Sequence, residues 1–309
     1  MSNLAVLHHQ HALAPSDSPF WCAALGEAST EMPEMASRID ALSRDMARLP
    51  VRAALTRPVV GQYLSMVRTL AAAWQARSRP ALGAAFGMLA FVGRSMAEPP
   101  ILAQLQKRTT APQAVDGLRR RMAAPLAAFD ALGADLASYL AQMARASLEL
   151  ESDTALVTER LQADGVHAFL LSQQASALQS RLDDAGLRQD AHWLGPHAGH
   201  LRQEIVLHAS ALEGVRRQLA QLQSEQAATR AEADYLQSML PALAAYLGAV
   251  ESMGAAIDTL RDGAARTSHA LALLATELAH AGPGQAVAQL EAALPRWAAV
   301  AGAASALQR

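Results

Sequence analysis

Four histidines near the middle of the chain are the residues whose type and spacing come closest to a chemical site. His192, His197 and His200 lie in a short segment broken by Gly195-Pro196, and His208 follows. Spacings of five and three residues do not match the fixed tetrahedral set that zinc requires. Because histidine changes charge between about pH 5 and 8, a pH-responsive segment is one hypothesis. A turn that simply tolerates polar rings is the other.

No second constellation predicts catalysis. P-loop, dinucleotide-binding, nucleophile-elbow and HExxH motifs are absent from the sequence. The carboxylate pairs Glu149/Glu151 and Asp183/Asp184 are expected on solvated helix faces. The single Cys22 excludes an internal disulfide framework and a thiolate metal cluster. We therefore predict that the protein is not an enzyme and uses neither a cofactor nor a metal.

Charge and composition exclude further classes. The formal net charge is -2, and the densest basic run, Arg119-Arg120-Arg121, carries no aromatic stacking pattern, so no nucleic-acid partner is expected. Apolar residues make up 51% of the chain but aromatic residues only 4%. Much of the apolar share is alanine and leucine, which favour helix over sheet. The fold class is therefore predicted to be all-α.

Two stretches carry apolar residues at the 3.5-residue period of a coiled coil, and we call them seams. The first seam holds Leu126, Phe129, Gly133, Leu136, Leu140, Met143, Ser147, Leu150, Thr154, Val157, Leu161, Asp164, Ala168, Leu171, Ala175, Leu178 and Leu182. The second holds Leu201, Ile205, His208, Leu212, Val215, Leu219, Leu222, Gln226, Thr229, Ala233, Leu236, Leu240, Leu243, Leu247, Val250, Gly254, Ile257 and Arg261. Such a period predicts two long helices. A short link between them makes the helices fold back as an antiparallel hairpin.

The link, residues 183–200, forms the tip of this hairpin. The first long helix is expected to end near Gly186, a natural C-cap, and Pro241 should kink or divide the second. Trp193-Leu194 has no core to join at the tip, and tryptophan favours places with one apolar and one wet side. A membrane contact and a local cap over the helix ends are both consistent with this pattern.

Shorter helices at both chain ends are expected to bury their apolar faces against the open end of the hairpin. We predict a helical tail bundle of residues 1–125 and 241–309 and a stalk of residues 126–240. Ala81–Gly93 lacks polar side chains and is expected in the core of the bundle rather than in a membrane. No run of about eighteen apolar residues, the length that spans a bilayer, is found. The residues expected to pack the tail are Trp74, Phe86, Leu89, Phe91, Trp297 and Val300.

The whole arrangement resembles the α-helical pore-forming toxin superfamily, which includes cytolysin A, tripartite enterotoxin components and xenorhabdolysin-type binary toxins. The segment QLEAALPRWAAVAGAASALQ is similar to the closing helix of that superfamily, with Trp297 and Val300 at the tail-packing positions. Components that cross the bilayer carry a long apolar segment between the long helices, whereas only residues 183–200 lie there in this chain. The chain is therefore most similar to the second subunit of a xenorhabdolysin-type toxin.

The resemblance implies a non-enzymatic cytotoxin subunit. It would contact target-cell lipids through Leu187, His192, Trp193, Leu194 and His197 and join a membrane-spanning partner in a hetero-oligomeric pore. The exposed face of the stalk should offer apolar or small residues to neighbouring protomers. The N-terminus lacks a basic n-region and a long apolar core, and the resemblance implies secretion without a classical signal peptide. The alternatives are a coiled-coil scaffold, adaptor or secretion-related structural protein, and a sensor or regulator built on a helical hairpin.

Overall fold

The protein is all-α, as predicted. The computed structural model describes residues 18–49, 58–191, 198–281 and 283–308. Its helices are α1 (Ala23–Ala47), α2 (Pro58–Ala73), the π-helical turn η1 (Trp74–Ser78), α3 (Arg79–Met96), α4 (Pro99–Leu105), α5 (Ala111–Ala191), α6 (Ala198–Ala281) and α7 (Gly284–Leu307). Within these ranges the only β-type pairing is one isolated bridge between Ser18 and Trp21.

The chain divides into two compact units. The bundle unit comprises Met1–Pro50, Ser65–Arg145 and Leu243–Arg309, and the hairpin unit comprises Val51–Leu64 and Ala146–Ala242. On α6 the boundary between the two units lies after Ala242. On α5 it lies after Arg145, so residues 126–145 belong to the bundle unit. Short helices cover this stretch of α5 and bury Phe129 and Leu136 completely.

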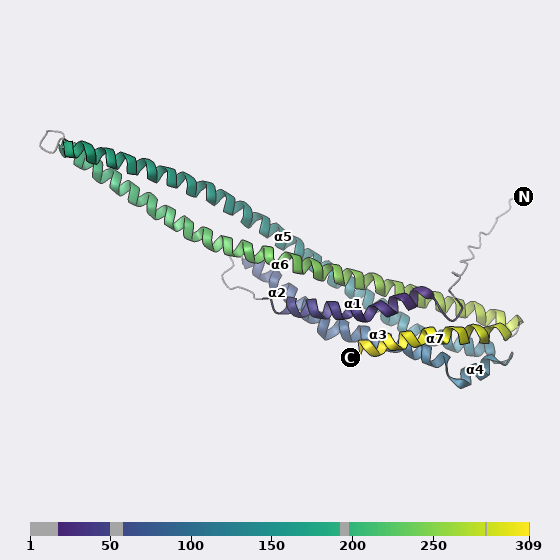
Figure 1. Ribbon diagram of the computed structural model, residues 1–309. Helices are drawn as coiled ribbons and strands as arrows, with labels where there is room; N and C mark the ends of the chain where they lie inside the picture. The colour runs from purple at the N-terminus through teal and green to yellow at the C-terminus, as the bar shows by residue number, and fades with distance from the viewer. Residues whose placement is uncertain (1–17, 50–57, 192–197, 282, 309) are drawn as a thin grey trace, which may run out of the picture. The chain divides into compact units, whose positions relative to one another are not determined.

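The bundle unit is built from α1, the end of α2, η1, α3, α4 and α7, together with one end of each long helix. Helix α7 packs against α3 and α1 (Figure 1). The Phe86 ring of α3 meets the Phe129 ring of α5 edge to face, at a centroid distance of 5.8 Å. Trp297 of α7 meets Trp21 edge to face and donates its indole N–H to the Phe20 carbonyl at 2.8 Å. Such aromatic pairs, fully removed from water, dominate the energy of a small core.

Helices α2 and α3 are joined without a break by the π-helical turn η1. A π-turn inserts one residue into the helical repeat and so rotates the following side chains. Here Trp74 is buried by that turn, and Gln75 and Arg79 reach toward α1.

Helices α5 and α6 form an antiparallel pair in the hairpin unit. Arg188 lies 3.4 Å from Glu204, and Arg216 donates to Gln179 at 3.1 Å, so residue numbers rise on one helix as they fall on the other. Every residue of both predicted seams, from Leu126 to Leu182 on α5 and from Leu201 to Arg261 on α6, is buried or half-buried. Leu201–Arg261 lies in one continuous helix, so the seam prediction is confirmed for helix length and buried face.

Helix α5 does not end at Gly186, and Pro241 does not divide α6. Helix α5 continues past Gly186 to Ala191, and α6 runs unbroken through Pro241. A glycine inside a helix costs only about 1 kcal/mol and ends the helix only where it adopts a C-cap conformation. Buried Met239 and Leu243 flank the exposed proline, so burial of the seam outweighs the one backbone hydrogen bond that proline removes.

Candidate functional site

The histidines near the hairpin end form no metal centre in the part that can be described. His192 and His197 lie outside the described residues, and His200 is exposed. His208 is half-buried, with Nε2 3.5 Å from Glu204 Oε1. Among the described residues, no three His, Cys, Asp or Glu side chains are grouped closely enough to hold a metal ion.

The expected membrane-contacting residues are only partly within the described chain. Trp193 and Leu194, like His192 and His197, lie outside it. Leu187 is described, and its side chain is 70% exposed on the last turns of α5. A leucine this exposed buries little in the folded chain itself, so it remains available for contact with another apolar surface.

Two further apolar residues flank the same end of the hairpin and were missed by the sequence analysis. Val206 is 66% exposed and Leu207 is 62% exposed, both on the first turns of α6. The pairing of Arg188 with Glu204 places this part of α6 beside the turns of α5 that carry Leu187. Both residues follow the seam position Ile205 directly, at outward heptad positions where charged side chains are usual. That deviation from the heptad pattern was the signal in the sequence.

The residues expected to pack the tail lie as follows. Trp74, Phe86, Leu89, Trp297 and Val300 are buried. Phe91 is 51% exposed, so the expectation that it lies in the core is wrong. It belongs to an apolar run, but α3 has one outward face, and the register set by Phe86 and Leu89 turns Phe91 to that face. The guanidinium of Arg121 lies 5.9 Å from the centre of its ring instead.

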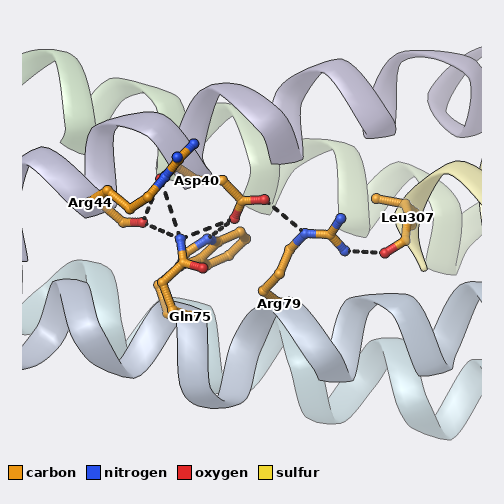
Figure 2. A network of polar contacts seen from close by, with 7 residues as sticks. Asp40, Arg44, Gln75, Arg79 and Leu307 are labelled. Carbon is orange, nitrogen blue, oxygen red and sulfur yellow. Dashed lines mark hydrogen bonds and ion pairs between the residues drawn. The ribbon is translucent and has the colours of Figure 1, made fainter. Parts of the chain in front are cut away.

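A polar network in the bundle unit joins α1, η1, α3 and α7 (Figure 2). Asp40 accepts a hydrogen bond from the Trp74 indole at 2.8 Å and an ion-paired one from Arg79 at 3.1 Å. Arg79 also donates to the backbone carbonyl of Leu307, and Gln75 donates to Ser43 at 2.6 Å. One carboxylate thus orients the π-turn and, through Arg79, the end of α7. No sequence motif predicted this network, because its residues are far apart in the chain.

A buried tyrosine pair connects α5 and α6 within the bundle unit. Tyr139 and Tyr246 share a hydrogen bond between their hydroxyls, and their rings meet edge to face at 6.3 Å. Burial raises the pKa of Tyr246 to about 12. Burial, reinforced by Tyr246, also raises the pKa of Tyr139 well above its usual range. The pair is therefore a structural contact that stays neutral at physiological pH.

Length and hydropathy make one described helix a candidate membrane span. An eighteen-residue window in α6 has a mean hydropathy of 1.4, and 33% of it is buried inside the protein. The α2–α3 run together with α4 passes the same test as a pair bent by 56°. The sequence analysis looked for about eighteen consecutive apolar residues and found none, whereas a window of mean hydropathy tolerates isolated polar residues. Core helices of soluble proteins pass this test as well.

No protein-family model matches the sequence, and no curated protein matches it. Solved structures do match. Soluble SmhA of the tripartite α-pore-forming toxin Smh from Serratia marcescens has a TM-score of 0.61 at 11% identity, over 94% of each chain. Soluble AhlB of the tripartite toxin AHL from Aeromonas hydrophila has a TM-score of 0.62 at 11% identity, over 92% of each chain. Soluble AhlC of the same toxin has a TM-score of 0.57 at 12% identity, over 89% of this chain and 97% of AhlC.

This chain has the fold of the α-pore-forming toxin components. The superfamily resemblance seen in the sequence therefore holds at the level of the fold, and it covers nearly the whole length of each of these proteins. These three structures come from tripartite systems, and a shared fold at this identity does not select a particular subunit.

Proposed function

We propose that this chain is a non-enzymatic subunit of a multi-component pore-forming cytotoxin. It contacts the target membrane with the tip of its hairpin and assembles with a membrane-spanning partner. The observation that carries the proposal is the combination of the toxin-component fold with exposed apolar side chains on both helices beside the tip. Neither an enzyme nor an intracellular scaffold requires apolar side chains at the end of a coiled coil.

The chemistry of the tip supports weak, reversible lipid binding. Leu187, Val206 and Leu207 are each more than half exposed in the folded protein. Full burial of such a side chain is worth about 1.5 to 3 kcal/mol. Three of them, with Trp193 and Leu194 in the adjoining link, suit contact with the interfacial region. One tip binds modestly, and an assembly of several copies binds much more strongly through multivalency.

The segment between the long helices supports a division of labour between subunits. Residues 192–197, which join α5 to α6, are too few to supply two bilayer spans, which need about 40 residues. We therefore assign the spanning role to a partner, as in a xenorhabdolysin-type binary toxin. The solved AhlB is known in soluble, pre-pore and pore forms. By analogy, this chain passes from a soluble form to a membrane-associated form on the target cell.

Vesicle flotation tests the contact with lipid. Leu187→Ser combined with Leu207→Ser should reduce recovery with phosphatidylcholine–phosphatidylserine vesicles several-fold, and Trp193→Ala combined with Leu194→Ala should do the same. Val166→Ser combined with Phe169→Ser is the matched control, since both side chains are 62% exposed on α5 but lie more than fifteen residues before Leu187. Equal binding by all four proteins would remove the tip from the mechanism.

Dye release tests the pore-forming activity itself. The partner to include is a helical protein, encoded beside this chain, with an apolar segment of about 35 to 40 residues, enough for two spans. We expect release only when both proteins are present, and loss of release in the tip variants. A coiled-coil scaffold, the alternative, would bind no vesicles and would leave release by the partner unchanged.

A further inference from the structure

An open apolar groove on the bundle unit is not explained by the fold or by the tip. It has a volume of about 460 Å³ and lies between α3 and α5. Its lining is Ala84, Gly87, Met88, Phe91, Arg120, Arg121, Ala124, Pro125 and Gln308. Met88 is 42% exposed and Phe91 is 51% exposed, so large apolar side chains form one wall in contact with water.

The rim of this groove carries excess positive charge. Asp116 is shared by Arg119 at 2.9 Å and Arg120 at 3.1 Å, and Arg121 lies 3.9 Å from Glu98. Arg94, one turn beyond Phe91 on α3, is exposed and pairs with no described carboxylate. Of these arginines, only Arg120 and Arg121 line the groove itself. Each is paired with a carboxylate that is either shared with Arg119 or 3.9 Å away, so the rim keeps an excess of positive charge.

The outer face of α5 in the hairpin unit has the opposite character. Leu148 is 66% exposed and Leu156 is 47% exposed, at the outward heptad positions b and c when the seam occupies a and d. Glu149, Glu151 and Glu159 are exposed on the same stretch. Glu151 accepts only a long hydrogen bond from Ser147, at 3.3 Å, and the other two pair with no described cation.

This acidic face, residues 148–159, also has few neutralising neighbours. Arg160 is engaged by Asp164 at 3.7 Å, which leaves Arg145 as the flanking cation. Three carboxylates against one guanidinium leave a net charge of about -2. The face thus offers apolar side chains set among carboxylates, and the groove offers apolar side chains set among arginines. Opposite charges that surround apolar side chains on both surfaces are typical of two surfaces that bind each other.

We infer that the groove between α3 and α5 binds the acidic α5 face, residues 148–159, of a second copy of this chain. Leu148 or Leu156 enters the groove beside Phe91 and Met88, and Glu149, Glu151 and Glu159 meet the arginine rim. Each copy carries both surfaces, so the pairing closes when it is reciprocal, as in a two-fold dimer. An anionic lipid would satisfy the arginines but would leave the acidic face of α5 unexplained.

Charge reversal on each surface tests the pairing by sedimentation velocity, with no membrane present. Arg120→Glu with Arg121→Glu alters only the groove, and Glu149→Arg with Glu151→Arg alters only the acidic face. Each variant alone should weaken self-association at least about tenfold, as expected for opposed like charges at an interface. An equimolar mixture of the two variants should associate again, because both reciprocal contacts between unlike chains are then complementary. The single variant Phe91→Ser should also weaken association at unchanged helicity.

The matched charge controls are Arg266→Glu and Glu277→Arg, both on exposed positions of α6. They should leave association unchanged, and raising the salt to about 0.5 M should weaken association of the native chain. A native chain that stays monomeric at about 100 μM overturns the inference, as does association that survives both reversals. Loss of association without recovery in the mixture also overturns it, since the two surfaces are then not partners. Binding of phosphatidylserine vesicles that only the groove variant loses, without self-association, assigns the groove to lipid instead. Failure of vesicle lysis leaves this result untouched, so the dimer and the toxin function are tested separately.

Discussion

The bundle unit and the hairpin unit bury different kinds of side chain. The bundle unit encloses Trp74, Phe86, Phe129, Tyr246 and Trp297 almost completely, and its buried polar side chains are small hydroxyls. The described part of the hairpin unit buries no aromatic residue. Its seam is closed by aliphatic side chains together with buried Asp153, Thr154, Thr229 and Glu232.

This difference in buried side chains implies that the bundle unit contributes more to the stability of the fold than the hairpin unit does. Buried aromatic rings each remove a large apolar area from water, whereas buried carboxylates add little net stability even when they are partnered. Exposed apolar residues lie outward along the hairpin helices, including Leu148, Val166, Phe169 and Val206. We expect the hairpin to open or exchange partners at a lower free energy than the bundle.

The largest expected effect comes from placing a charge in the bundle core. Phe86→Asp should lower the free energy of unfolding by more than about 4 kcal/mol, because it empties an aromatic site and buries a carboxylate. Phe91→Asp, five residues along the same helix but half-exposed, should cost less than about 1 kcal/mol. Thermal and urea unfolding followed by circular dichroism would measure both. Equal melting temperatures for the two variants would contradict the assignment of Phe86 to the core.

Alkaline pH should destabilise the bundle unit through its tyrosine pair. In the unfolded chain a tyrosine ionises near its ordinary pKa of 10, whereas in the fold Tyr246 ionises near 12 and Tyr139 higher still. Stability is therefore complete below pH 10 and falls as pH rises toward 12, by about 1.4 kcal/mol per pH unit for each tyrosine. Urea unfolding at pH 9, 10 and 11 checks the slope. Tyr139→Phe with Tyr246→Phe should flatten it, and an unchanged slope in that variant would assign the effect elsewhere.

Loss of the Asp40 carboxylate should loosen the junction of α1, α3 and α7. Asp40→Ala leaves the Trp74 indole and the Arg79 guanidinium without their shared acceptor, which should cost about 2 to 3 kcal/mol. Asp45→Ala, on the exposed face of the same helix, is the control and should be nearly neutral. Urea unfolding compares the two variants, and indole hydrogen exchange of Trp74 should accelerate only in the first.

Two glycines on α3 distinguish close packing from open surface. A Cβ at Gly93 would lie 2.7 Å from the Trp297 ring, whereas a Cβ at Gly87 would meet only the mobile end of Gln308, at 3.3 Å. Gly93→Ala should therefore cost about 1 to 2 kcal/mol of stability, since overpacking exceeds the gain in helix propensity. Gly87→Ala should be neutral or stabilising by up to about 1 kcal/mol. The melting temperature should fall for Gly93→Ala and should not fall for Gly87→Ala, and an equal decrease in both variants would refute the packing of Trp297 on α3.

The smallest effect on stability is expected beside the hairpin tip. Leu187→Ser with Leu207→Ser should change the free energy of unfolding by no more than about 0.5 kcal/mol, because both side chains are already exposed. Circular dichroism melting checks this result. A large loss of stability would mean that these residues pack within the protein, and their effect on vesicle binding would then need another explanation.

The apolar period predicted much of the architecture. Both seams, the antiparallel hairpin and the burial of Phe86 and Trp297 follow from the spacing of apolar residues and from the short link between the long helices. Helix ends were less predictable. Gly186 and Pro241 are breaking residues whose effect depends on whether neighbouring seam residues are held by a partner helix, and here burial prevails.

Within the candidate sites, the sequence pointed to Leu187 and to the tip but not to Val206 or Leu207. A residue one or two positions after a seam residue cannot be told from an ordinary surface residue until the register of α5 against α6 is known. Phe91 shows the converse. A continuous apolar run does not indicate which of its side chains face outward, because that is decided by the helices packed around α3.

The sequence by itself determined that this protein is helical, that two of its helices are very long, and which stripe of each is buried. Those properties depend on local helix propensity and on an apolar repeat that recurs every three or four residues along each helix. Only the tertiary structure decided that Asp40 joins four elements, that Phe91 and Met88 line an arginine-rimmed groove, and that Trp297 closes on Gly93. These contacts bring together residues as many as 228 positions apart in the chain, such as Arg79 and Leu307, and no local pattern encodes which distant surfaces meet.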